Sequence, residues 1–209
     1  MKYEPINFDR LIGMRGFSDL LLKDHFTLYQ GYVANTNKLY ESLRLFDREE
    51  KPSNSEYSEI KRRFGWEFNG MRLHELYFGN MTRNGSEEKG DILIRKIAYN
   101  FGSVQDWEYS FKNVGKIRGI GWILLSYDPV ADRLFNIWVN EHDGGNLAGS
   151  VPLLIMDVFE HAYLADYGLK REEYVTAFFK VIDWRVISER LESVVFKKSE
   201  LQNANWPVS

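Results

Sequence analysis

The sequence predicts an α+β fold, with an N-terminal long antiparallel helical hairpin and a C-terminal domain in which helices surround a three-stranded antiparallel sheet. Two observations lead to this fold class. Apolar residues recur at helical spacing over two long N-terminal segments, and three strand-like segments follow one another closely in the second half. Helices that come first and strands that come together are typical of α+β proteins rather than of alternating βα units.

The first helix is predicted over residues 17–46, with Ser18 as its N-cap. The polar stretch 47–55 contains Pro52 and interrupts the pattern. A second apolar stripe at helical spacing then covers residues 60–78. A short polar connection between two such helices predicts an antiparallel hairpin.

The polar, glycine-containing stretch 83–90 is the best candidate for an internal boundary. We expect an N-terminal helical-hairpin domain over residues 1–86 and a C-terminal α/β domain over residues 87–209. The second domain is predicted to contain two short helices, the second capped by Ser103, then three strands, then a helical tail. Their predicted ranges are 88–100 and 103–116 for the helices, 122–128, 133–140 and 151–157 for the strands, and 171–196 for the tail.

Composition excludes several classes of protein. The chain has 209 residues, a formal net charge of −3 and no cysteine. Nucleic acid is not an expected partner, because phosphate binding needs a basic excess. Disulfides, thiolate nucleophiles and iron–sulfur clusters are excluded, so any metal must be held by nitrogen and oxygen. The apolar runs are too short to cross a bilayer and the first ten residues lack a hydrophobic signal core, so no membrane partner and a cytoplasmic location are expected.

The four histidines are candidate metal ligands. His25 and His74 lie within the apolar stripes of the two predicted helices. Each could be a buried histidine that simply finds a hydrogen-bond partner. Two facing helices with one inward imidazole each are nevertheless a common start of a metal site in a helical bundle.

Asp157 and His161 follow the third predicted strand, four residues apart. The alternative reading is a helix cap followed by a surface histidine. Together with His25 and His74 they would supply three nitrogens and one anionic oxygen, a ligand set that suits iron or manganese. His142, after the second strand, is either a turn residue or a hydrogen-bond donor to metal-bound solvent.

The segment Asp157-Val-Phe-Glu-His-Ala-Tyr163 resembles the D-V-W-E-H-A-Y signature of the iron/manganese superoxide dismutase family. The resemblance runs from about residue 18 to 190 and includes Gly70-Met-Arg-Leu-His74. It implies that His25, His74, Asp157 and His161 bind one iron or manganese ion per subunit, between the two domains.

The segment after the first ligand is one residue shorter than the family pattern. A regular helix would then place His25, Tyr29 and Tyr32 on one face, and Tyr32 would be the gateway tyrosine at the substrate channel. The position of the family's second histidine falls on Leu28 or Tyr29, and which of the two replaces it stays open.

The resemblance also assigns roles around the metal. The family's glutamine beside the bound solvent has no counterpart at Gly70, so His142 takes its place, which makes this chain a divergent member. Trp122 and Phe159 are expected to wall the metal in. Glu160, with Tyr163 and Tyr29, is expected beside the ligands or at the contact of a homodimer, although a tetramer stays open.

The implied activity is conversion of superoxide to dioxygen and hydrogen peroxide, an antioxidant reaction, by redox cycling of the metal. Tyr32 and His142 would be its catalytic residues. Two alternatives stay open: a non-haem iron oxygenase that uses two histidines and a carboxylate, and an inactive superoxide-dismutase-like structural or binding protein. The choice between iron and manganese also stays open.

Overall fold

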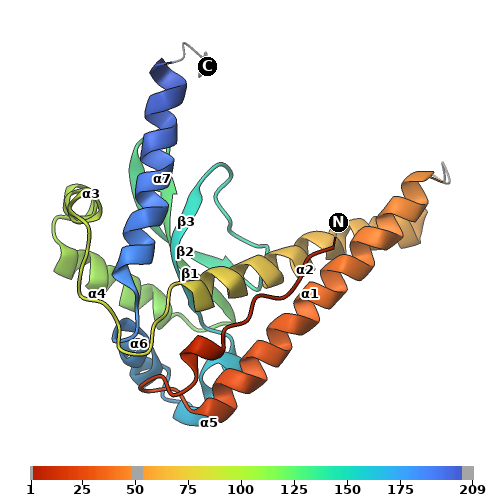
Figure 1. Ribbon diagram of the computed structural model, residues 1–209, viewed down its shortest axis with the longest axis horizontal. Coiled ribbons are helices and arrows are strands. Elements are labelled where there is room, and N and C mark those ends of the chain that lie inside the picture. Colours follow the sequence, from red (N-terminus) through yellow and green to blue (C-terminus); the bar gives the residue numbers. More distant parts are fainter. Residues whose placement is uncertain (1, 49–53, 204–209) are drawn as a thin grey trace.

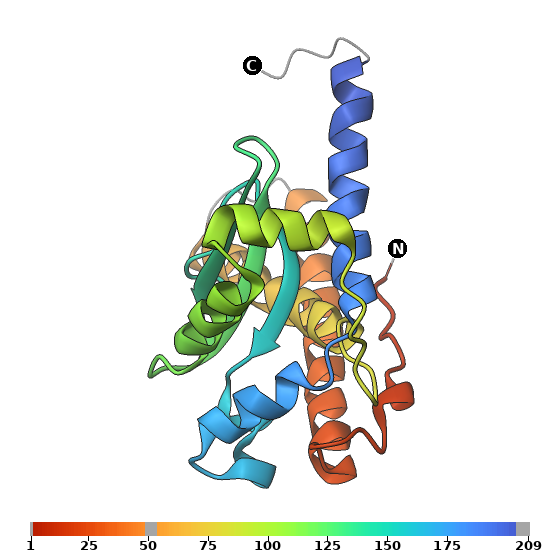
Figure 2. The same ribbon diagram turned by 90° about the vertical axis from the view of Figure 1, so that its left-hand side faces the viewer.

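The structure, a computed structural model, describes residues 2–48 and 54–203, with side chains through Phe196. Figure 1 shows a long helical pair on one side and, on the other, a small sheet with helices packed around it. This arrangement confirms the predicted α+β fold class. Figure 2 shows the last helix rising beside the sheet, away from the short helices at the bottom of that view.

The helical pair consists of α1 (Asp19–Arg48) and α2 (Ser55–Gly79), which run antiparallel (Figure 1). Leu21 N donates to Ser18 Oγ at 3.1 Å, so Ser18 caps α1 as predicted. Asn54 caps α2 in the same way, accepting from Tyr57 N at 2.7 Å. The predicted interruption by Pro52 lies outside the described residues. A short 3₁₀ helix, η1 (Asp9–Leu11), precedes the pair.

The sheet is antiparallel with the order β2-β1-β3. The central strand β1 is buried along almost its whole length, whereas most residues of the outer strand β2 are exposed or half-buried. Trp122 pairs with Asp157 in the register of β1 and β3, so the two residues lie side by side. The strands are β1 (Gly121–Asp128), β2 (Arg133–Asn140) and β3 (Val151–Asp157), and they confirm the predicted segments.

Helices pack around this sheet as predicted. Ser103 caps α4 by accepting from Asp106 N at 3.0 Å. The elements are α3 (Asp91–Phe101), α4 (Val104–Gly115), η2 (Glu160–Ala162), α5 (Leu164–Tyr167), α6 (Arg171–Phe179) and α7 (Trp184–Asn203).

The C-terminal tail differs from the prediction, because residues 171–196 form two helices and not one. The backbone of residues 180–183 leaves the helical path and bonds to the segment after α2. Thr82 N donates to Val181 O at 2.8 Å, Ser86 N to Ile182 O at 2.9 Å, and Asp183 N to Asn80 O at 3.0 Å. This tertiary pairing replaces the hydrogen bonds that a continuous helix would make.

One hydrophobic core joins the helical pair to the sheet and its helices, since buried residues of α1, α2, β1, β3 and α6 form a single cluster. The carboxyl end of β3 therefore lies against the buried faces of α1 and α2. Within the described residues, no helix combines the length and apolar character needed to cross a bilayer.

Candidate metal centre

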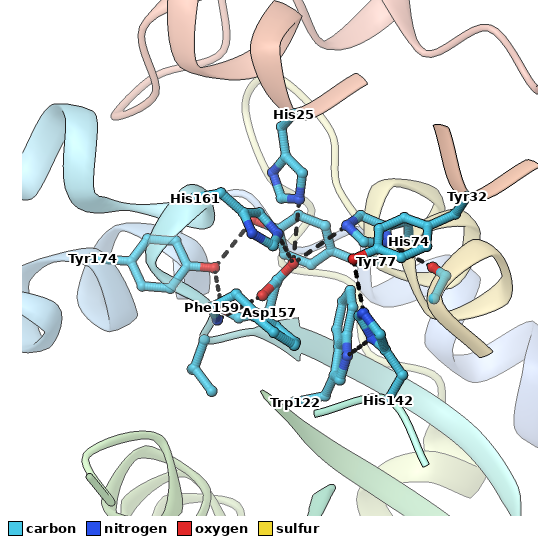
Figure 3. Close-up of polar contacts among 12 residues, drawn as sticks. His25, Tyr32, His74, Tyr77, Trp122, His142, Asp157, Phe159, His161 and Tyr174 are labelled. Atoms are coloured by element: carbon cyan, nitrogen blue, oxygen red, sulfur yellow. Dashed lines mark hydrogen bonds and ion pairs between the residues drawn. The ribbon is translucent and has the colours of Figure 1, made fainter. Parts of the chain in front are cut away.

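Four side chains from four different elements meet where β3 ends (Figure 3). His25 comes from α1, His74 from α2, Asp157 from the last position of β3 and His161 from η2. One ligand atom of each residue lies within 4.8 Å of all the others. The sequence-predicted ligands are thus brought together.

The centre of the cluster is one oxygen of Asp157. Its Oδ2 lies 3.2 Å from His25 Nε2, 3.2 Å from His161 Nε2 and 3.7 Å from His74 Nε2. The other oxygen, Oδ1, accepts from Phe159 N at 2.8 Å, as in an Asx turn. This turn fixes the carboxylate so that one oxygen holds the backbone and the other faces the imidazoles.

His74 provides the test of whether a metal fits. Its Nδ1 lies 2.6 Å from Gly70 O, an acceptor, so Nδ1 carries the proton and Nε2 carries a lone pair. That Nε2 is buried and has no hydrogen-bond partner among the described residues. A buried lone pair beside a carboxylate and two more imidazoles is the donor set that a divalent or trivalent cation satisfies.

Burial also sets the protonation of the cluster. It lowers the pKa of His25 and brings the pKa of His74 well below its usual value, which keeps both imidazoles neutral. Burial alone would raise the pKa of Asp157, but its electrostatic interactions and hydrogen bonds with His161 and then His25 hold that pKa well below its usual range. Neutral imidazoles and an ionised carboxylate are the forms that bind metals.

A second polar network lies beside the cluster and contains His142. Trp122 Nε1 donates to His142 Nδ1 at 3.0 Å. Because indole can only donate, the proton of a neutral His142 is on Nε2, which donates to the Tyr32 hydroxyl at 2.9 Å. Burial lowers the pKa of His142 to about 4, so this imidazole is neutral near pH 7. Figure 3 shows the chain Trp122, His142, Tyr32 next to the four converging groups.

Tyr32 and His142 are held by ring contacts. Tyr32 stacks on His74 with centroids 5.1 Å apart, and Phe159 stacks on the buried His142 at 4.8 Å. The ring of Trp122 meets His74 edge to face at 4.9 Å. The predicted wall residues Trp122 and Phe159 therefore contact both the candidate ligands and the His142 network.

Comparison with known proteins identifies the family to which this chain belongs. A family model described as iron/manganese superoxide dismutases, C-terminal domain, matches residues 89–190. The iron superoxide dismutase of Aquifex pyrophilus is 36% identical over 199 residues, which cover 93% of each chain. The chain belongs to the iron/manganese superoxide dismutase family. A manganese superoxide dismutase of Haloferax volcanii is 37% identical over 171 residues, covering 82% of this chain and 84% of that one.

Membership of the iron/manganese superoxide dismutase family confirms the resemblance inferred from the motif. The relatives include proteins named for iron and proteins named for manganese at similar identity. The names of the relatives therefore support a metal of this pair without deciding between its two members.

The segment after His25, which the resemblance predicts to be one residue short, forms a regular helix. α1 is α-helical without interruption from Asp19 to Arg48, and His25 and Tyr29 are both buried on its inner face. The Tyr29 hydroxyl donates to Glu75 Oε1 at 3.0 Å and accepts from Ile6 N at 3.0 Å, so it holds the N-terminal segment. Leu28, by contrast, is partly exposed.

Glu160 and Tyr163 lie beside His161 but outside the cluster. Glu160 is exposed, and with Leu21, Asp24 and Leu164 it lines a cleft of about 440 Å³ that reaches His161. Tyr163 is buried, stacks on Tyr174 at 5.4 Å and accepts from Arg171 Nε at 3.3 Å. Tyr163 thus supports the turn that carries His161.

The sequence analysis missed two contacts of this site. Trp66 packs edge to face on His142 at 4.4 Å, and its Nε1 donates to Glu141 Oε2 at 3.1 Å. Trp66 lies one helical turn before Gly70, so helical spacing could have found it. The Tyr174 hydroxyl donates to the backbone oxygen of Asp157 at 2.6 Å, and no local pattern indicates this bond.

Proposed function

We propose that this protein is a superoxide dismutase. In the proposed reaction, two superoxide anions and two protons give dioxygen and hydrogen peroxide. One iron or manganese ion per subunit is held by His25, His74, Asp157 and His161. The observation that carries the proposal is the convergence of three imidazole nitrogens on Asp157 Oδ2, with the buried His74 Nε2 unpartnered among the described residues.

When bound, iron or manganese supplies a one-electron couple between a trivalent and a divalent state, so that one superoxide is oxidised and the next reduced. Asp157 contributes a buried negative charge that favours the higher charge state. Its carboxylate is oriented by Phe159 N, and its backbone oxygen by the Tyr174 hydroxyl. Trp122 and Phe159 limit the access of bulk water.

Protons are held by Tyr32 and His142. Because His142 Nε2 donates to the Tyr32 oxygen, the hydroxyl proton of Tyr32 is directed elsewhere and can be donated to a substrate oxygen. Burial, chiefly, raises the pKa of Tyr32, so the hydroxyl keeps its proton at neutral pH. Solvent then replaces each proton that Tyr32 gives up.

The two alternative functions have less support. An inactive relative has no need to keep four side chains converged on one point, three of them buried, and the side chains of this cluster are present. A non-haem iron oxygenase uses two histidines and one carboxylate. Here a third imidazole, His161, lies as close to Asp157 Oδ2 as His25 does.

The proposal includes a homodimer, in which Glu160 bonds the metal-binding histidine of a second copy. It is supported by the exposed Glu160 beside His161 and by the cleft that opens there. A tetramer remains the alternative.

We further propose a domain boundary between residues 86 and 87, supported by a family match that begins at residue 89. A cytoplasmic location is consistent with a chain without cysteine, and cell fractionation tests it.

The deciding experiment is superoxide dismutation by metal-free protein reconstituted separately with iron and with manganese, at matched metal content. Zinc-loaded protein is the control, because zinc fills nitrogen and oxygen sites but does not change its oxidation state. High activity with iron, manganese or both supports the proposal. If protein fully loaded with iron and protein fully loaded with manganese are both inactive, the proposal is wrong.

A further inference from the structure

The outer edge of β3 is closed by side chains. In the described part of the chain only β1 pairs with β3 in the sheet. Leu153 O accepts from Arg190 Nη1 at 2.6 Å, and Ile155 N donates to Asn80 Oδ1 at 2.9 Å. Residues two apart on a strand turn their backbone groups to the same edge, so these bonds satisfy neighbouring groups that a further strand would otherwise bind.

The same two side chains hold the carboxyl end of α2. Arg190 Nη2 donates to Leu76 O at 3.0 Å, and Asn80 Nδ2 donates to Tyr77 O at 2.8 Å. These carbonyls belong to the last turn of α2, where Asn80 N is the one backbone donor that they share, at 3.0 Å from Leu76 O and 3.2 Å from Tyr77 O. Arg190 Nη1 also lies 3.5 Å from Asn80 Oδ1. We call this pair the Asn80–Arg190 clamp, since it bonds α2 on one side and β3 on the other.

The clamp lies a few residues from two candidate ligands. Leu76 follows His74 by two residues on α2, and Ile155 precedes Asp157 by two residues on β3. At about 1.5 Å per residue on a helix and about 3.3 Å on a strand, these bonded groups lie within one turn or one strand repeat of the ligands. A change in the distance between α2 and β3 at the clamp would therefore shift His74 relative to Asp157 by a similar amount.

The clamp is also rigid. Asn80 is fully buried, and its backbone oxygen accepts from Asp183 N at 3.0 Å. Burial lowers the pKa of Arg190 to about 10, which leaves the guanidinium charged near pH 7. A charged guanidinium with carbonyl acceptors on two elements forms a fixed fork, which an ammonium group cannot reproduce.

We propose that Asn80 and Arg190 are positioning residues that set the separation of His74 from Asp157, and thereby the geometry of the metal centre. The inference rests on the proposed function, because it assigns the clamp to the metal site of that function.

Arg10 offers a matched control. Its guanidinium also binds carbonyls near the end of α2, namely Phe78 O in the last turn at 2.9 Å and Met81 O just after the helix at 2.6 Å. Within the described residues, the hydrogen bonds of the Arg10 side chain include none to β3. Arg10→Met thus removes an arginine from the same helix end without breaking a bond to the strand that carries Asp157.

The experiment compares iron-loaded wild type, Arg190→Met, Arg190→Lys and Arg10→Met at equal iron content. The readouts are the electron paramagnetic resonance spectrum of the ferric protein, the rate of iron loss to a chelator, and Tm. In Arg190→Met we expect an altered spectrum and iron loss about 10- to 100-fold faster than in wild type. Arg190→Lys should fall between the two, and Arg10→Met should keep the wild-type spectrum despite a lower Tm.

Equal spectra and equal loss rates in Arg190→Met and Arg10→Met would overturn the clamp but leave the proposed function standing. Wild-type protein that retains neither iron nor manganese overturns both. If Arg190→Met does not fold, Asn80→Ala and Arg190→Lys decide. A wild-type spectrum in both of these variants rejects the proposal, and a changed spectrum in both supports it.

Discussion

Gly70 and Tyr32 are in direct contact across the helical hairpin. A Cβ added at Gly70 would lie 2.6 Å from Tyr32 Cδ1 and 2.8 Å from Cε1, well inside van der Waals contact. No side chain from position 70 can therefore reach the site while Tyr32 stacks on His74. A side chain that donates a hydrogen bond to metal-bound solvent therefore has to come from the sheet side of the site, where His142 lies.

Gly70→Ala should displace the Tyr32 ring and weaken its bond to His142. We expect dismutation to fall by about 10- to 100-fold, the scale of a misplacement near 1 Å, while metal content is retained. The matched control is Gly65→Ala on the same helix, where an added Cβ meets no atom within 4 Å. That change should leave activity unaltered and raise stability by about 0.5–1 kcal/mol. Equal activity in the two variants contradicts the steric argument.

His142→Gln should preserve much of the activity, whereas His142→Leu should lose it. A glutamine amide has an oxygen that accepts from Trp122 Nε1 and a nitrogen that donates to the Tyr32 hydroxyl, in the same order as His142. Leucine fills similar space with neither group. At matched metal content, we expect a rate about 10- to 100-fold lower for His142→Leu. Similar rates for glutamine and leucine would show that the network has no part in catalysis.

Glu160→Ala should weaken both dimerisation and metal retention, since the proposed bond reaches a metal-binding histidine of the second copy. Sedimentation velocity gives the oligomeric state, and metal analysis after dialysis gives the retention. The control is Glu189→Ala, which removes an exposed glutamate on α7, away from His161 in the sequence. Unchanged sedimentation and metal content in Glu160→Ala reject the bridge.

Stability should fall at alkaline pH because buried tyrosines must lose a proton on unfolding. Burial and then the bond to Asp132 raise the pKa of Tyr127 above its usual value of 10. A folded pKa above the unfolded one gives stability that is complete below pH 10 and declines as the pH rises beyond it. Urea unfolding of Tyr127→Phe between pH 8 and 11 should show a shallower decline than wild type. If the free energy of unfolding declines equally with pH in both proteins, Tyr127 does not have a raised pKa in the folded state.

Periodic segments were predictable from the sequence, and tertiary pairing was not. The stripes of α1 and α2 predicted both helices, because apolar spacing records which face is buried. The break before α7 was missed, since it depends on bonds such as Thr82 N to Val181 O, between residues 99 positions apart. No local pattern near residue 181 indicates such a partner.

The candidate ligands were predictable for a different reason. Four histidines in 209 residues can each be considered, and Asp157 with His161 stands in a recognisable motif. Asn80 and Arg190 carry no such signal, since an asparagine after a helix and an arginine in a helix are common. Their significance depends on the outer edge of β3, which is identified only once the sheet order is known.

The four converging groups are spread along the chain from residue 25 to residue 161, one on each of four elements. A growing chain therefore cannot assemble this constellation during synthesis until β3 and the turn after it have left the ribosome. Under the proposed function, a metal can bind all four groups only after residue 161 has emerged, so the supply of iron and manganese from that moment on helps to decide which ion is taken.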